Sequence, residues 1–207
     1  MIKKLNNNKF INNLSWIFVG NVAHAILSFL LNIYVARVIN VGDYGLINYA
    51  SSWISFFSSL CTLGFNGVIT KKFADDYESA GKYLGTAILL RFLSSAVSVG
   101  ALQIIAGISP DEPLLRAIVL CQSMTIVFGS LDVFIYWFQY NNGAKLVALL
   151  RFGAFIVSAA ARITVLLTTK SVIQYVAATS IETVVFGVSM LCAFKKEHQF
   201  KLSFSIH

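Results

Sequence analysis

The sequence predicts an all-α, polytopic membrane protein whose 207 residues form a single bundle of six transmembrane helices. Composition is the first observation: 57% of the residues are hydrophobic and only 12% are charged, whereas soluble domains have roughly 45–50% and roughly 25%. The mean hydropathy of +0.74 is the second. Third, six apolar segments are long enough to cross about 30 Å of hydrocarbon as helices. A soluble domain of this size could not bury so much apolar surface.

The six predicted spans cover residues of about 14–36, 44–66, 83–107, 114–138, 144–168 and 171–194. Helix is the expected form of each span, because a segment in lipid must satisfy its backbone hydrogen bonds internally. The sequence pattern shows no strand alternation of the outer-membrane type.

The first two spans are joined by a short turn, Val41-Gly42-Asp43, which is typical of a break between helices. The first apolar run exceeds the roughly 7–15 residues of a signal-peptide core, so we expect an uncleaved span. The second span is the most polar, and it contains Ser51, Ser52, Ser55, Ser58 and Ser59. A helix surrounded by lipid does not need these serines, so they indicate close helix packing or a water-filled cavity.

The other four spans are separated by short polar connections. Both prolines of the chain lie in the loop of residues 109–113, between the third and fourth spans, and neither interrupts a helix. The last span ends before Lys195 and Lys196, which begin a polar tail to His207.

Lysine and arginine predict the orientation. If the N-terminus is cytoplasmic, ten lysines fall on the cytoplasmic side, and the outer side receives Arg37, Arg116 and Lys170. This imbalance follows the positive-inside rule, so both termini are predicted to be cytoplasmic. The net charge of +7 is then mainly a topology signal, and we expect no nucleic-acid partner.

Six ionisable residues fall within the predicted spans: His24, Arg91, Asp132, Arg151, Arg162 and Glu182. An ionised group at the centre of a bilayer costs at least about 2.5–3.5 kcal/mol. We therefore expect most of these side chains to face the protein interior or water. Counted along each helix, Arg91, Asp132 and Arg151 lie about 9–12 Å from the cytoplasmic ends of their spans.

The arginines support two interpretations. Arg151 and Arg162 are eleven residues apart, which is close to three helical turns, so they share one face. Facing a cavity, they would attract an anionic substrate, because arginine stays charged and binds phosphate or carboxylate with two parallel hydrogen bonds. The alternative is internal pairing, of Asp132 with Arg151 or Arg91 and of Glu182 with another partner.

Glu182 and His24 lie at similar depth and also have two interpretations. They are candidates for binding a coupling proton, because burial can bring their pKa values toward neutrality. Alternatively, they form a hydrogen-bonded pair between helices or are satisfied separately.

The sequence gives little indication of a catalytic or metal site. The three cysteines, Cys61, Cys121 and Cys192, stand apart from one another, and no Cys/His spacing suggests a metal, so we expect no metal and no cofactor. The segment 75–78, Asp-Asp-Tyr-Glu, is similar to an acidic motif of prenyl-handling enzymes. Neighbouring lysines make a solvated, charge-balanced loop the alternative. We expect a protein that is not an enzyme.

Residues 34–76 resemble the first two helices of polysaccharide transporters, the O-antigen flippases of the MOP (multidrug/oligosaccharidyl-lipid/polysaccharide) superfamily. The matching motifs are Ala36-Arg37, Tyr44-Gly45 and Gly64-Phe65. Asn40 stands where the family has a glycine in its first turn. Hydropathy and loop order extend the resemblance over all 207 residues.

The resemblance implies one lobe of a MATE-like transporter in the bacterial inner (cytoplasmic) membrane. Such a flippase moves an undecaprenyl-diphosphate-linked oligosaccharide to the outer leaflet by alternating access through a cationic cavity. The substrate-binding residues would be Arg91, Arg151, Arg162 and, by motif, Arg37. Family members have two six-helix lobes, so the chain is interpreted as an N-terminal half that needs a second lobe or a homodimer partner. The other implied partners are membrane lipids, a coupling proton or sodium ion, and polysaccharide polymerase machinery.

Three other functions are compatible with parts of the sequence. A small-molecule or drug antiporter of the same superfamily would present acids to a cationic substrate, whereas this chain has three intramembrane arginines and two acids. A membrane-embedded transferase would need a catalytic acid–base set, for which only Asp75, Asp76 and Glu78 are available. The length also leaves open a non-transporting, truncated lobe or membrane scaffold.

Overall fold

The computed structural model describes residues 7–62, 80–108, 113–141 and 143–197, and all the regular elements among them are helical. The all-α prediction is therefore confirmed for this part of the chain. The elements are α1 (Asn7–Val38), α2 (Val41–Thr62), α4 (Ala80–Ile108), α5 (Pro113–Gly129), the 3₁₀ turn η1 (Ser130–Asp132), α6 (Val133–Tyr140), α7 (Ala144–Thr168) and α8 (Val172–Glu197). Because α5, η1 and α6 follow one another without a loop, they make one long helical unit, and the described residues form six such units.

Five of the six units are long and apolar enough to cross a membrane, so the chain is a multi-pass membrane protein. Their apolar stretches are Ser15–Val38, Tyr83–Ile108, Pro113–Tyr140, Ala144–Thr168 and Val172–Lys196. The predicted second span corresponds to α2, which is not among these five; residues 63–66 of that span lie outside the described part of the chain. Its serines lower the hydropathy of the helix.

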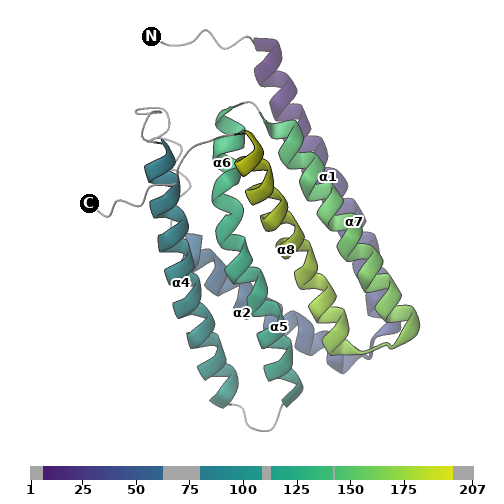
Figure 1. The fold of residues 1–207 in the computed structure, drawn as a ribbon. Coiled ribbons are helices and arrows are strands. Elements are labelled where there is room, and N and C mark those ends of the chain that lie inside the picture. The colour runs from purple at the N-terminus through teal and green to yellow at the C-terminus, as the bar shows by residue number, and fades with distance from the viewer. Residues whose placement is uncertain (1–6, 63–79, 109–112, 142, 198–207) are drawn as a thin grey trace.

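The helices are arranged around α8 and α5 (Figure 1). Helix α8 packs between α7 and α5, α1 lies on α7, and both α4 and α2 pack on α5. Helix α2 turns away from α1 after their connection and leans toward α4. The beginning of α1 and the end of α8 lie at the same end of the bundle.

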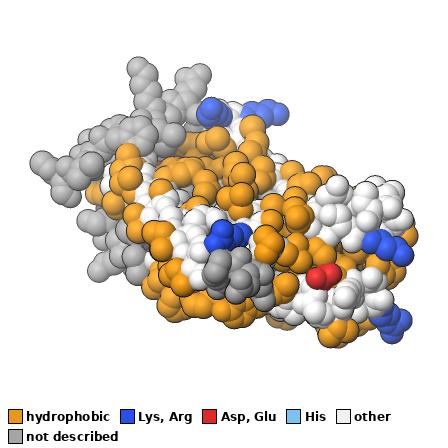
Figure 2. Space-filling model, turned by 90° about the horizontal axis from the view of Figure 1, so that it is seen from below, with side chains coloured by type: hydrophobic (Ala, Val, Ile, Leu, Met, Phe, Trp, Pro, Cys, Tyr) orange, Lys and Arg blue, Asp and Glu red, His pale blue; other side chains and the backbone are white. Residues whose placement is uncertain are grey.

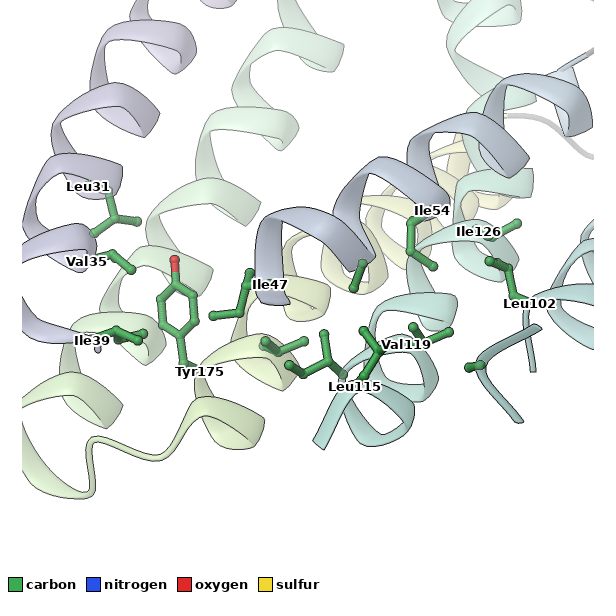
Figure 3. Packing of buried hydrophobic residues seen from close by; sticks show 14 of the residues in the cluster. Leu31, Val35, Ile39, Ile47, Ile54, Leu102, Leu115, Val119, Ile126 and Tyr175 are labelled. Atoms are coloured by element: carbon green, nitrogen blue, oxygen red, sulfur yellow. The ribbon is translucent and has the colours of Figure 1, made fainter. Parts of the chain in front are cut away.

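The end of the bundle that contains the α1–α2 turn is held by a hydrophobic cluster (Figure 3). Helices α1, α2, α4, α5 and α8 all contribute to it, through Leu31, Val35, Ile39, Ile47, Ile54, Leu102, Leu115, Val119, Ile126 and Tyr175. A second cluster, rich in aromatic residues, fills the other end with Leu84, Phe134, Trp137, Phe138, Phe186, Met190 and Phe194. The space between the two clusters contains the polar residues described below.

The α1–α2 turn explains how Asn40 replaces a glycine. The Asn40 side-chain oxygen accepts a hydrogen bond from the backbone N–H of Gly42 at 3.2 Å, and its backbone carbonyl accepts from Tyr44 N–H at 2.9 Å. Asparagine is among the best residues for satisfying the free N–H groups at a helix start. Asn40 therefore begins α2 directly.

Hydrophobic side chains cover much of the surface, as expected for a bundle in lipid. Figure 2 shows the end of the molecule that carries the α1–α2 turn, where hydrophobic side chains dominate and charged ones are scattered. Large exposed side chains are frequent on α1, including Phe18, Phe29 and Leu30. Helix α1 is also the least buried of the five candidate spans.

Gly187 allows α8 to approach the η1 turn, and replacing it with valine is expected to destabilise the bundle. A Cβ atom at this position would lie 3.0 Å from Leu131 Cδ1 and 3.1 Å from the backbone oxygen of Phe128. Overpacking of this kind costs about 1–3 kcal/mol. The check is the midpoint of thermal unfolding in detergent for Gly187→Val against Gly100→Val, whose added Cβ meets nothing within 4 Å. Equal midpoints would contradict this account of the packing.

Candidate functional site

The described helices enclose an open polar cavity of about 700 Å³. Five of the six helical units contribute to its walls: α2, α4, the α5–η1–α6 unit, α7 and α8. Its volume falls within the range of about 300–1,000 Å³ that is usual for ligand sites. The lining residues are Ile54, Ser55, Ser58, Ser59, Thr62, Arg91, Thr125, Gly129, Asp132, Ile135, Tyr136, Gln139, Arg151 and Thr183.

Two backbone features create this cavity. First, α2 leaves α1 and packs on α4 and α5, so its polar second half forms one wall instead of closing against α1. Second, the 3₁₀ turn Ser130–Asp132 interrupts the fourth span and places Asp132 at the start of α6 without a side-chain capping bond. The Asp132 carboxylate therefore does not cap the N-terminus of α6 and is available to other groups in the cavity. Short 3₁₀ segments inside long helices are frequent at functional hinges.

Arg91 and Arg151 give the cavity its charge. Arg91 is only 3% exposed and hydrogen-bonds Tyr136, another lining residue. The Arg151 guanidinium lies over the Phe186 ring, 4.9 Å from its centroid. Both guanidinium groups interact electrostatically with Asp132. Among the described lining residues, two arginines therefore face one carboxylate, and the cavity carries one excess positive charge.

Next to the cavity, Glu182 joins three helices. Its Oε1 lies 2.7 Å from Nε2 of His24 on α1, and its Oε2 accepts a hydrogen bond from the Arg162 guanidinium of α7, also at 2.7 Å. The three side chains are only 32%, 21% and 11% exposed for His24, Glu182 and Arg162. The Phe155 ring packs edge-on to His24, with centroids 4.9 Å apart. This is an interhelical polar cluster of the kind that the sequence offered as one of two interpretations.

A smaller cavity of about 170 Å³ connects this cluster with the larger one. Asn21, His24 and Glu182 line it together with Asp132 and Arg151. Asp132, Arg151 and Thr183 line both cavities. The ionisable residues that the sequence placed inside the membrane therefore form one connected polar region.

The structure divides the four predicted substrate-binding arginines into two groups. Arg91 and Arg151 lie together in the cavity with Asp132. Arg162 does not line that cavity; its guanidinium is bonded to Glu182 instead. Arg37 is exposed in the last turn of α1, just before the α1–α2 turn, and is not among the lining residues of the cavity. The acidic segment 75–78 and the motif residues Gly64 and Phe65 lie outside the described residues.

Sequence reasoning did not single out the neutral residues of the site, among them Tyr136, Gln139 and Thr183. Tyr136 and Gln139 lie four and seven residues after Asp132, so helical spacing was the available signal for these two. Thr183 directly follows Glu182, and neighbouring residues of a helix do not share a face, so spacing gave no signal for it. Among the described residues, no group of three or more His, Cys, Asp or Glu is able to hold a metal.

Together, the apolar exterior and the charged interior cavity define a polytopic helical membrane protein of the transporter type. A family model described as polysaccharide biosynthesis protein matches residues 10–206. The chain therefore belongs to the polysaccharide biosynthesis protein family, in agreement with the resemblance of residues 34–76. Comparison with curated proteins and with solved structures gave no match.

Proposed function

We propose that the protein is a flippase that moves an undecaprenyl-diphosphate-linked oligosaccharide across the bacterial inner membrane. The observation that carries this proposal is the pair Arg91 and Arg151 in an open intramembrane cavity whose described lining has one excess positive charge. Guanidinium groups suit a diphosphate, because they remain charged and bind its oxygens with two parallel hydrogen bonds. The protein moves the lipid without breaking a covalent bond, so it is not an enzyme.

The charge also favours this substrate over a cationic drug. A cationic molecule would meet two guanidinium groups and one carboxylate among the described lining residues, so its entry is electrostatically unfavourable. The substrate of this proposal carries the opposite charge. Membership of a polysaccharide biosynthesis family agrees with an oligosaccharide cargo.

Alternating access requires a second moving body, and the proposal includes one. A second lobe or a second copy of the chain would close the open side of the cavity, as in two-lobed transporters. The start of α1 and the end of α8 lie at the same end of the bundle, which supports placing them on the same side of the membrane. In this arrangement that side is the cytoplasm. Glu182 and His24 are the candidates for a coupling proton, because protonation of Glu182 would weaken its bonds to His24 and Arg162.

The test is transport by the full chain in reconstituted vesicles. In protein-free vesicles, a glycosidase added outside reaches only oligosaccharide on the outer leaflet. With the protein, we expect nearly all of the lipid-linked oligosaccharide to become accessible, and we expect added undecaprenyl diphosphate to slow this process. A lipophilic cation is the control competitor and should have no effect. An accessible fraction equal to that of protein-free vesicles, or competition by the cation alone, would contradict the proposal.

A further inference from the structure

The cavity has a second chemical feature besides its arginines, a set of hydroxyl side chains on α2 and α5. Four lie on α2 at spacings of three or four residues, which places them on one face of the helix, and the fifth is on α5. We call them the hydroxyl wall: Ser55, Ser58, Ser59, Thr62 and Thr125. The arginines come from other elements, Arg91 from α4 and Arg151 from α7.

The hydrogen bonds within the hydroxyl wall determine what it offers to a ligand. Ser59 Oγ donates to the Ser55 carbonyl at 2.8 Å, and Thr62 Oγ1 donates to the Ser59 carbonyl at 2.7 Å. Thr125 Oγ1 donates to the Gln122 carbonyl at 2.6 Å. A hydroxyl has one proton and two lone pairs. Because the three protons are used by the backbone, these oxygens offer only lone pairs to a molecule in the cavity.

A surface of acceptors selects its ligand chemically. Phosphate oxygens are acceptors themselves, so the Ser59, Thr62 and Thr125 oxygens do not bind them, whereas the Arg91 and Arg151 guanidinium groups do. Sugar hydroxyls and the N–H of an acetamido group are donors, and they complement the lone pairs of the wall. The cavity thus has a donor region on α4 and α7 and an acceptor region on α2 and α5.

We propose that the hydroxyl wall is a saccharide subsite that accepts hydrogen bonds from a neutral sugar next to the diphosphate. This inference rests on the proposed flippase function and adds a substrate class: sugars rich in hydroxyl or acetamido groups are favoured at the wall over uronic acids, whose carboxylates are acceptors. Most of the wall belongs to α2, the helical unit of the described chain that is not among the candidate membrane spans. Ser51, which is not part of the wall, packs against Gln122 of α5 through a 2.9 Å hydrogen bond, whereas the serines of the wall line the cavity.

The experiment compares two probes for binding to the full chain in lipid nanodiscs. One is undecaprenyl diphosphate, and the other is undecaprenyl diphosphate bearing a single N-acetylglucosamine. The variant Ser59→Ala/Thr62→Val/Thr125→Val removes the three acceptors and keeps side-chain shape. We expect its affinity for the glycosylated probe to fall about tenfold, equivalent to losing one or two ordinary hydrogen bonds. Its affinity for undecaprenyl diphosphate should stay within twofold of the original.

The matched control is Ser52→Ala/Thr164→Val/Thr168→Val. These three hydroxyls are exposed, lie outside the cavity, and donate to backbone carbonyls four residues earlier, at 2.9, 2.8 and 2.7 Å. The control therefore removes the same chemical groups and the same kind of helix bond, and it should bind both probes normally. If the triple cavity variant fails to fold, Thr62→Val alone is used, with an expected loss of about threefold for the glycosylated probe only.

The outcomes separate this inference from the proposed function. Unchanged binding of the glycosylated probe by the folded variant overturns the saccharide subsite, and so does an equal loss for both probes. In either case the flippase proposal is still tested separately, by the effect of replacing Arg91 and Arg151 on the binding of undecaprenyl diphosphate. If the original protein binds neither probe, the proposed function fails, and the saccharide subsite fails with it.

Discussion

Replacing Arg91 and Arg151 together with glutamine is expected to lower transport of a lipid-linked oligosaccharide by at least a hundredfold. Hydrogen bonds to charged groups are worth about 1.5–3 kcal/mol each, so two lost guanidinium contacts reach that factor. The double variant also leaves Asp132 as the one charged side chain of the described cavity lining. A cavity with an excess positive charge becomes one that repels a diphosphate.

The matched control is Lys195→Gln/Lys196→Gln, which removes two positive charges from exposed residues at the end of α8. Both double variants are measured by the vesicle assay, with membrane insertion and unfolding midpoint as folding checks. The control should transport within twofold of the original protein. A folded Arg91→Gln/Arg151→Gln variant with normal transport would show that the cavity is not the anion site.

Much of this cavity could be predicted from the sequence, because depth along a helix follows from counting residues. Arg91, Asp132 and Arg151 were placed at similar depth from the cytoplasmic ends of their spans, and the structure brings them into one cavity. The serines of the second span indicated close packing or a cavity, and α2 shows both: Ser51 bonds Gln122, and Ser59 lines the cavity.

Other features could not be read from the sequence, since they depend on which helices pack together. Helical spacing places Arg151 and Arg162 on one face but does not say what covers that face. In the folded bundle α8 packs on α7, so Arg162 meets Glu182, while Arg151 reaches the cavity. The inclination of α2 likewise results from tertiary packing. The 3₁₀ turn before α6 does have a sequence signal, because the pair Gly129-Ser130 lies where it begins.

Arg37 illustrates the limit of transferring a role by motif. The motif Ala36-Arg37 supports the family resemblance, and the family is shown by the match over residues 10–206. The side chain, however, is exposed just before the α1–α2 turn and is not among the lining residues of the cavity that contains Arg91 and Arg151. A substrate contact of Arg37 therefore stays a prediction of the family resemblance, separate from the cavity of Arg91 and Arg151.

Glu182→Leu is expected to cause the largest loss of stability among single substitutions at the polar cluster. It removes the carboxylate shared by His24 and Arg162, and the Arg162 side chain is only 11% exposed. Removing one partner of a buried ion pair costs about 3–5 kcal/mol, because the remaining charge is uncompensated. Glu182→Gln should cost less, since its amide oxygen still accepts a hydrogen bond from one of the two partners.

The decisive comparison for this cluster is a double-mutant cycle between Glu182→Leu and Arg162→Leu. If the cluster is a structural ion pair, removing both side chains leaves no unpaired buried charge between them. The double variant should then be more stable than Glu182→Leu alone. The measurement is the free energy of unfolding in detergent for the four proteins of the cycle. Additive losses would show that the two side chains do not stabilise each other despite their 2.7 Å contact. Glu182 also bonds His24. If the double variant regains stability but loses ion-dependent transport, the cluster has a coupling role as well as a structural one.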